Sequence, residues 1–317
     1  MEQHSDSSRP TAAVKPVSSL LLPITFNVSN MNILIQAAKP DYMHPISGGL
    51  KKLFHRDTAV PQVGSFKIHS DTPIIHEFKY PVSADSVLTG FTTLQMSPRK
   101  AGIKVGITGT QLDPHHIKYQ LDTTPTLDLD KAITTYVDPA GLGHTTQFGT
   151  VALDSYMTDQ VPPLSIPVKF TTPFTTAPHV TLWISKLDFP TGTRLGIECR
   201  AIHATPTGFT VFVTGLMDLP RKGNEVTWVA HPDTSEVVSG NFILGKGTDY
   251  RAKTCHPKIS ENSQVFLAFN MFSGPIDAID FEINSIELKE GALTVGGRTG
   301  DSKYFTMGAV YLIFPPV

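Results

Sequence analysis

Arg200 is the residue whose type and setting are best suited to binding chemistry. It lies in the stretch TRLGIECRAIHATPTGF, residues 193–209, in which apolar residues alternate with Glu198 and Arg200. Alternation of this kind predicts a strand with one buried face and one exposed face. Two interpretations of Arg200 are open. It is either a solvated partner of Glu198, in an ion pair of little energetic value, or a fixed fork of donors for a ligand.

Two other groups of polar residues could do chemistry. Asp113, His115 and His116 could hold a metal ion, but adjacent side chains on a strand diverge. Asp128 and Asp130 would share one strand face, as a pair of catalytic carboxylates does, yet their alternation with leucine fits an exposed sheet face better. The sequence has no GxSxG elbow. We therefore predict no catalytic residue, no metal site and no cofactor.

Two glycine-rich segments carry basic residues. They are GKGTDYRAK, which begins at Gly245, and GGRTGDSK, which begins at Gly296. Neither has the spacing of a phosphate-binding loop. We interpret both as hairpin turns. Arg298 in the second segment could serve a different ligand.

The composition predicts an all-β protein. Across 317 residues, 25 prolines and 24 glycines punctuate short extended runs. The formal net charge of -2 argues against a nucleic-acid partner. Two cysteines, Cys199 and Cys255, make no disulfide framework.

The first residues, MEQHSDSSRPTAAVKP, are polar and lack the order of a secretion signal. The apolar run that follows at residues 20–22 is too short to cross a bilayer. We therefore expect no membrane insertion, and either a cytoplasmic location or release without a signal peptide.

Three segments of the chain share one layout. Each opens on a glycine followed by a short strand, continues through a second strand and a hairpin, and closes on an aromatic strand. The opening glycines are Gly64, Gly149 and Gly240, and the closing aromatic residues are Tyr136, Trp228 and Tyr311. Short strands with tight turns in a span of this length imply a small antiparallel β-sandwich. Such a sandwich buries little surface alone, so the units should associate.

These segments define the expected domain organisation. We predict three units at residues 61–140, 146–233 and 236–317. Residues 1–60 form an N-terminal extension that we expect to be partly disordered, because its first residues have little apolar content.

The middle unit resembles the H-type lectin domain family. The resemblance rests on VKFTTPFTTAPHVTLWISKLDF from Val168, LGIECRAIHATPTGF from Leu195 and VTWVAHP from Val226, and it covers about 80 residues. It implies six-stranded antiparallel β-sandwiches that assemble as trimers and bind galactose or N-acetylgalactosamine near the seams between protomers. Three tandem units in one chain would then form a pseudo-trimer.

The resemblance also implies a site. Arg200 stands where family members carry an arginine that donates hydrogen bonds to sugar hydroxyls, which its planar fork suits. Leu216 and Met217 stand in place of a Trp-His pair and offer only loose apolar contact. The family adds an aspartate from the first-strand loop of a neighbouring protomer. The candidates for it are Asp71, Asp154 and Asp249.

The other two units lack the arginine. At its place the first unit has Ile107 or Thr108, and the third has Ile283 or Asn284. One site per chain binds weakly, so avidity would require a homo-oligomer.

We predict a carbohydrate-binding lectin whose partners are galactose- or N-acetylgalactosamine-type glycans or glycoproteins. The alternative is a structural or protein-interaction scaffold that has the same fold and has lost sugar binding. A lectin would keep Arg200 exposed, whereas a scaffold would bury it against Glu198.

Overall fold

The computed structural model describes twelve stretches of the chain: residues 61–69, 72–98, 103–123, 127–138, 145–153, 163–189, 194–215, 223–234, 236–246, 250–275, 279–299 and 306–316. All of them belong to one compact unit, His55–Val317. The predicted N-terminal extension lies outside the described residues. The described residues form eighteen strands and no helix, which confirms the all-β prediction.

The strands fall into three consecutive sets of six, which we call repeats 1, 2 and 3. Repeat 1 contains β1 (Gln62–Ile68), β2 (Ile74–Glu77), β3 (Leu88–Pro98), β4 (Ile103–Gln111), β5 (His116–Thr123) and β6 (Leu127–Asp138). Repeat 2 contains β7 (Gln147–Ala152), β8 (Leu164–Lys169), β9 (His179–Phe189), β10 (Arg194–Thr205), β11 (Gly208–Thr214) and β12 (Glu225–His231). Repeat 3 contains β13 (Val238–Lys246), β14 (Tyr250–Cys255), β15 (Gln264–Pro275), β16 (Ile279–Lys289), β17 (Ala292–Thr299) and β18 (Thr306–Phe314).

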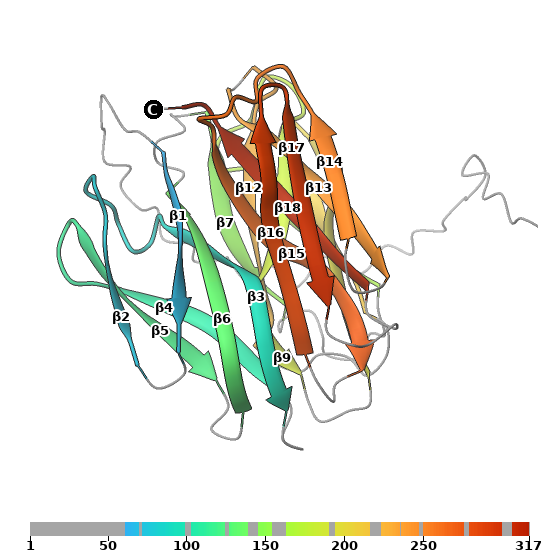
Figure 1. Cartoon of the computed structure of the whole chain (residues 1–317). Helices are drawn as coiled ribbons and strands as arrows, with labels where there is room; N and C mark the ends of the chain where they lie inside the picture. Colours follow the sequence, from blue (N-terminus) through green and yellow to red (C-terminus); the bar gives the residue numbers. More distant parts are fainter. Residues whose placement is uncertain are drawn as a thin grey trace, which may run out of the picture. The chain divides into compact units, whose positions relative to one another are not determined.

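Each sheet is built from two repeats. Sheet A has the order β1-β6-β3-β16-β17-β14, sheet B the order β2-β5-β4-β9-β12-β7, and sheet C the order β13-β18-β15-β10-β11-β8. Every strand pair is antiparallel. In Figure 1, sheet A runs across the front of the view, and the red β16 lies beside the cyan β3.

The fourth strand of each repeat pairs with the third strand of another repeat, in cyclic order. The three pairs, which we call seams, are β4 with β9, β10 with β15, and β16 with β3. Three six-stranded antiparallel sheets therefore form, which is consistent with the predicted three six-stranded antiparallel β-sandwiches. Because every sheet joins strands from two repeats, the sheets do not mark where one unit ends and the next begins. The boundaries of the three domains therefore stay a prediction.

The two glycine-rich segments are not hairpin turns, so that prediction is wrong. The first connects β13 in sheet C to β14 in sheet A, and the second leads from β17 in sheet A to β18 in sheet C. Both segments therefore join strands of different sheets. Glycine-rich turn chemistry is common to tight hairpins and to such crossings, so the sequence alone could not separate them.

The opening glycines and closing aromatic residues of the three repeats are cross-strand partners. Gly64 pairs with Tyr136, Gly149 with Trp228 and Gly240 with Tyr311. A β-carbon on Gly64 or Gly240 would lie 2.5 Å from the hydroxyl oxygen of the paired tyrosine, and one on Gly149 would lie 3.1 Å from the Trp228 ring. The glycine therefore recurs because the paired aromatic side chain occupies the space that a β-carbon would need.

A central core lies where the third strands meet. Strands β3, β9 and β15 contact one another, and they share a buried cluster with residues of β6, β12 and β18. The cluster contains Leu88, Val137, Trp183, Val229, Val237, Phe266, Ala268, Val310, Leu312 and Phe314.

Trp183 fills the centre of this core. The register places it at the position of Gly90 in repeat 1 and of Ala268 in repeat 3. Its indole nitrogen donates to the Thr89 carbonyl oxygen at 2.8 Å, and its ring lies 4.8 Å from that of Phe266. A β-carbon on Gly90 would lie 2.6 Å from that of Ala268. At this position of the three repeats the core therefore holds one large and two small side chains, whereas three identical repeats would place the same side chain there three times.

The junction of repeats 2 and 3 is polar. His231 is buried, and its Nδ1 lies 3.2 Å from the Pro232 carbonyl oxygen. Since a carbonyl only accepts, Nδ1 carries the proton, and Nε2 accepts from the Ser239 hydroxyl at 2.7 Å. The His231 ring stacks on that of His179, which is bound to Asp233. Burial lowers the pKa of His231 to about 4, so its imidazole is neutral at neutral pH.

Repeat 1 holds a phenol in an apolar setting. Tyr119 is 2% exposed, its ring stacks on Phe66, and its hydroxyl oxygen has no hydrogen-bond partner among the described residues. Burial raises the pKa of this phenol. By contrast, the Tyr311 hydroxyl in repeat 3 lies 3.1 Å from the Thr254 hydroxyl.

We expect Tyr119→Phe to leave the free energy of unfolding unchanged or to raise it by about 1 kcal/mol, because it removes a buried polar atom that lacks a partner. Urea unfolding measures this. Tyr311→Phe is the matched control and should lose about 1 kcal/mol with its hydrogen bond. A loss at Tyr119 as large as that at Tyr311 would contradict the expectation and indicate a bound water.

Candidate functional site

The β10–β11 hairpin positions Arg200. The two strands pair with Arg200 opposite Phe212, and the hairpin turns at Pro206 and Thr207. Cys199 points to the opposite face, where it is fully buried. The predicted alternation is therefore confirmed, and Arg200 lies on the outer face of sheet C.

Arg200 is exposed, and its guanidinium carbon lies 4.9 Å from the centre of the Phe212 ring. A cation over an aromatic face is attracted by about 0.5–1 kcal/mol at exposed sites. Glu198 accepts a hydrogen bond from the Thr214 hydroxyl at 3.4 Å. The guanidinium is thus held over Phe212 and is not buried against Glu198, which fits the exposed arginine expected of a lectin.

Phe212 is a residue that the sequence reading missed. It is half-buried and alternates with the buried Val211 and Val213. The run FTVFVT carried the signal, because its alternation puts Phe212 on the exposed face, where an aromatic ring is less expected than a polar side chain.

The register settles which residues stand at the position of Arg200 in the other repeats. They are Thr108, opposite Gln120 in repeat 1, and Asn284, opposite Gly296 in repeat 3. Thr108 donates to Asp122 at 2.7 Å, and Asn284 donates to Glu282 at 3.0 Å. Neither offers a planar cation, so the three outer faces differ in chemistry.

The remaining predicted site residues lie outside the described residues. They are Leu216, Met217, Asp71, Asp154 and Asp249. Their part in a site stays a prediction.

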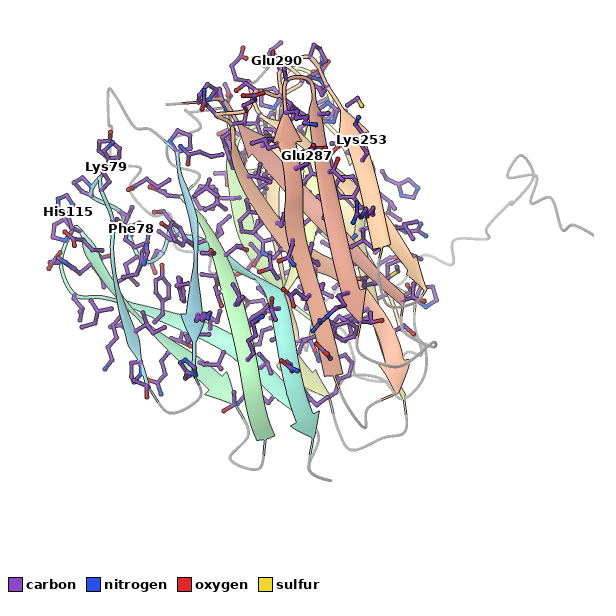
Figure 2. The ribbon with its side chains drawn as sticks, viewed as in Figure 1. Phe78, Lys79, His115, Lys253, Glu287 and Glu290 are labelled. Carbon is purple, nitrogen blue, oxygen red and sulfur yellow. The ribbon has the colours of Figure 1, made fainter. Side chains whose placement is uncertain are left out.

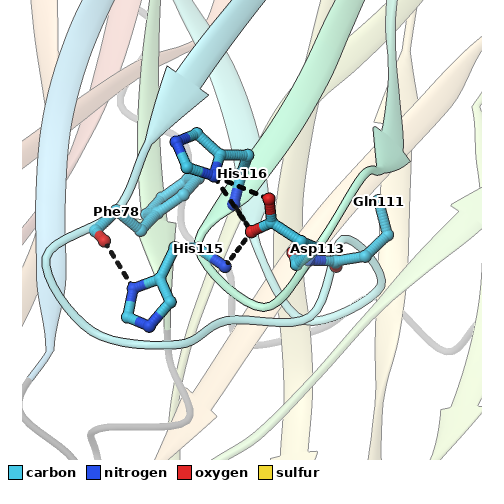
Figure 3. Close-up of polar contacts among 5 residues, drawn as sticks. All are labelled: Phe78, Gln111, Asp113, His115 and His116. Atoms are coloured by element: carbon cyan, nitrogen blue, oxygen red, sulfur yellow. Dashed lines mark hydrogen bonds and ion pairs between the residues drawn. The ribbon is translucent and has the colours of Figure 1, made fainter.

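Asp113 stabilises a hairpin turn. Its Oδ1 accepts the backbone N–H groups of His115 and His116 at 2.8 and 3.0 Å, and its carboxylate also contacts His116 Nδ1 (Figure 3). These hydrogen bonds, chiefly that from His115, hold the pKa of Asp113 below its usual value. The His115 ring turns away and contacts the Phe78 carbonyl oxygen at 3.0 Å. The described residues hold no cluster suited to a metal ion.

The two cysteines are both free thiols, Cys199 buried and Cys255 exposed. Burial raises the pKa of the Cys199 thiol. In the described part of the chain, no helix is long and apolar enough to cross a membrane.

An exposed guanidinium above an aromatic ring, on the outer face of a β-sandwich, is a surface suited to binding a hydroxyl-rich ligand. Residues 165–231 match the H-type lectin domain family. This span runs from β8 to the end of β12 and includes the whole β10–β11 hairpin. The resemblance of the middle unit is therefore confirmed, while three copies of the domain stay a prediction. A comparison with curated proteins and one with solved structures each gave no match.

Proposed function

We propose that the protein is a carbohydrate-binding lectin that recognises galactose- or N-acetylgalactosamine-type glycans through Arg200. The observation that carries this proposal is the position of Arg200, which is exposed within the span that matches the H-type lectin domain. The non-enzymatic character of that family supports a binding role.

Arg200 supplies directional donors. The guanidinium group lies over the Phe212 ring, and this contact limits its rotation. Less rotational freedom is then lost when two of its N–H groups grip neighbouring sugar hydroxyls. Leu216 and Met217 would form the apolar wall.

The three repeats would take the places of three protomers in a pseudo-trimer. The cyclic order of the three seams supports this arrangement. The three candidates for the acceptor aspartate follow the first strands of the three repeats. Asp249 follows β13, which lies in sheet C with β10. Asp71 follows β1 in sheet A. Asp154 follows β7 in sheet B.

A glycan array with Arg200→Ala tests the proposal. We expect binding to terminal galactose-type glycans to weaken by about 10- to 100-fold, because hydrogen bonds to a charged group are worth about 1.5–3 kcal/mol. Arg200→Lys should restore only part of it, since an ammonium lacks the planar fork. Lys253→Ala, which removes an exposed cation from sheet A, is the control and should bind normally.

Galactose binding that Arg200→Ala leaves unchanged would contradict the assignment of the site. No binding by the unmodified protein would favour the scaffold, whose support is the absence of the Trp-His pair. Three further variants then identify the acceptor, because only one of them should lower the affinity for galactose. They are Asp71→Asn, Asp154→Asn and Asp249→Asn.

The weak affinity of a single sugar site, about -4 kcal/mol, makes oligomerisation part of the proposal. A cytoplasmic location, or release without a signal peptide, is also proposed. Two free thiols fit a reducing compartment.

A further inference from the structure

The half of sheet A that belongs to repeat 3 presents two arginines outward. Arg251 on β14 and Arg298 on β17 are both exposed. Their neighbours Ala252 and Val295 point to the hydrophobic core on the other face. These strands, coloured orange to red, lie at the front right of Figure 1.

Gly296 lies between the two arginines. It pairs with Arg251 on one side and with Asn284 on the other, and Arg298 follows two residues along β17. Diagonal neighbours of this kind lie about 7–8 Å apart, within reach of long side chains. Gly296 stands where repeat 2 has Phe212 and repeat 1 has Gln120. No side chain therefore separates Arg251 from Arg298. The glycine itself is buried, so a ligand would meet the guanidinium groups and not the strand below.

The two guanidinium groups are weakly engaged within the described residues. Arg298 Nη2 lies 4.0 Å from Asp280 Oδ2, at the limit of an ion pair, and its side chain is 61% exposed. Arg251 has no acidic partner within ion-pair distance among the described residues. A pair of close cations whose donors face water favours an anionic group, because each planar fork matches two oxygens of a carboxylate or sulfate.

Acceptor and amide groups lie beside this pair. Glu282 is directly opposite Arg298 on β16 and contacts Lys131 across the seam at 3.7 Å. It also accepts a hydrogen bond from Asn284. A half-buried carboxylate and an exposed amide can bind sugar hydroxyls. The same carboxylate disfavours a long polyanion such as a nucleic acid, since it would repel successive phosphates.

We propose that Arg251 and Arg298 form a second site on sheet A, for a sugar that bears a carboxylate or sulfate group. Its anionic substituent lies between the two guanidinium groups, and its hydroxyls face Asn284 and Glu282. The site is separate from that at Arg200 and gives one chain two different sugar specificities.

The test uses the full chain on an array of galactose, glucose 6-sulfate and glucuronic acid, whose two acidic members lack the galactose configuration that the Arg200 site is proposed to recognise. We expect binding to at least one acidic sugar that falls about 10-fold or more in Arg251→Ala and in Arg298→Ala. The sulfated and the carboxylated probe distinguish the two substituents. Thermal unfolding of each variant checks that the fold is kept.

Lys253→Ala is the matched control. Lys253 is exposed, two residues along β14 from Arg251, and lies close to Glu287 (Figure 2). It carries the same charge on the same face but lies farther from Arg298, so its loss should change acidic-sugar binding less than twofold. Arg200→Ala should leave acidic-sugar binding unchanged.

Four results would overturn the inference. The first is no binding to either acidic probe, and the second is an equal loss of acidic-sugar binding in Lys253→Ala and in Arg251→Ala. The third is that inorganic sulfate, at the same concentration as the acidic sugar, displaces it completely. The fourth is a loss of acidic-sugar binding in Arg200→Ala. The first three would leave the Arg200 proposal as it stands, because galactose binding tests it separately, and the fourth would assign acidic-sugar binding to the Arg200 site. Failure of galactose binding alone contradicts the Arg200 proposal and leaves this one standing.

Discussion

Trp183→Ala is expected to lower the free energy of unfolding by about 4 kcal/mol, the cost typical of removing a fully buried tryptophan. Its neighbours cannot close the space, because the equivalent positions already hold a glycine and an alanine. The substitution also leaves the Thr89 carbonyl oxygen without the indole donor. Urea unfolding followed by linear extrapolation measures the loss.

Trp183→Phe is the control. It keeps most of the ring that contacts Phe266 and loses the hydrogen bond, so we expect a smaller loss of about 1–2 kcal/mol. If alanine costs no more than phenylalanine, the central core does not hold the three repeats together in the way we describe.

Acid is expected to destabilise the fold between pH 6.5 and pH 4 through His231. Burial is the main cause that lowers the pKa of His231 from 6.5 to about 4, and His179 and Lys258 lower it further, against the opposing effects of Pro232 and Asp233. The unfolded chain therefore binds a proton in this window that the folded chain does not. The stabilisation is complete above pH 6.5 and is lost as the pH falls to 4. A shift of this size corresponds to about 3 kcal/mol.

His231→Gln tests this prediction. Glutamine does not titrate, and it can still accept a hydrogen bond from Ser239. The difference in unfolding free energy between pH 7 and pH 4 should therefore be smaller in the variant by about 3 kcal/mol. His76, whose pKa burial also lowers, contributes in the same direction in both proteins. Parallel pH profiles of the two proteins would rule out His231 as the cause.

The features that repeat along the chain could be predicted from the sequence. The opening glycines and closing aromatic residues recur because each pair must lie together across two strands. The exposed position of Arg200 follows from alternation over one hairpin, which is a local property. The first prediction needed only a comparison of the three repeated segments, and the second needed only neighbours along the chain.

The features that depend on strand pairing between repeats could not be predicted from the sequence. Alternation states which face a residue occupies but not which strand lies beside it, so the sharing of each sheet by two repeats was not visible. For the same reason the sequence left two candidates for the position equivalent to Arg200 in repeat 1 and two in repeat 3. The strand register identifies these residues as Thr108 and Asn284. Arg251 and Arg298 belong to different glycine-rich segments, and only the pairing of β14 with β17 brings them together.

The seam between β16 and β3 has a consequence for how the protein is made. Thr93 on β3 pairs with Glu282 on β16, so β3, near the start of the described chain, gains this partner only after β16, near its end, has been synthesised. While the ribosome synthesises repeat 2, the edge of β3 presents unpaired N–H and C=O groups, and edges of this kind pair with other chains. A nascent chain that stops before β16 therefore carries an open edge that a second unfinished chain can join, whereas the finished chain closes that edge on itself.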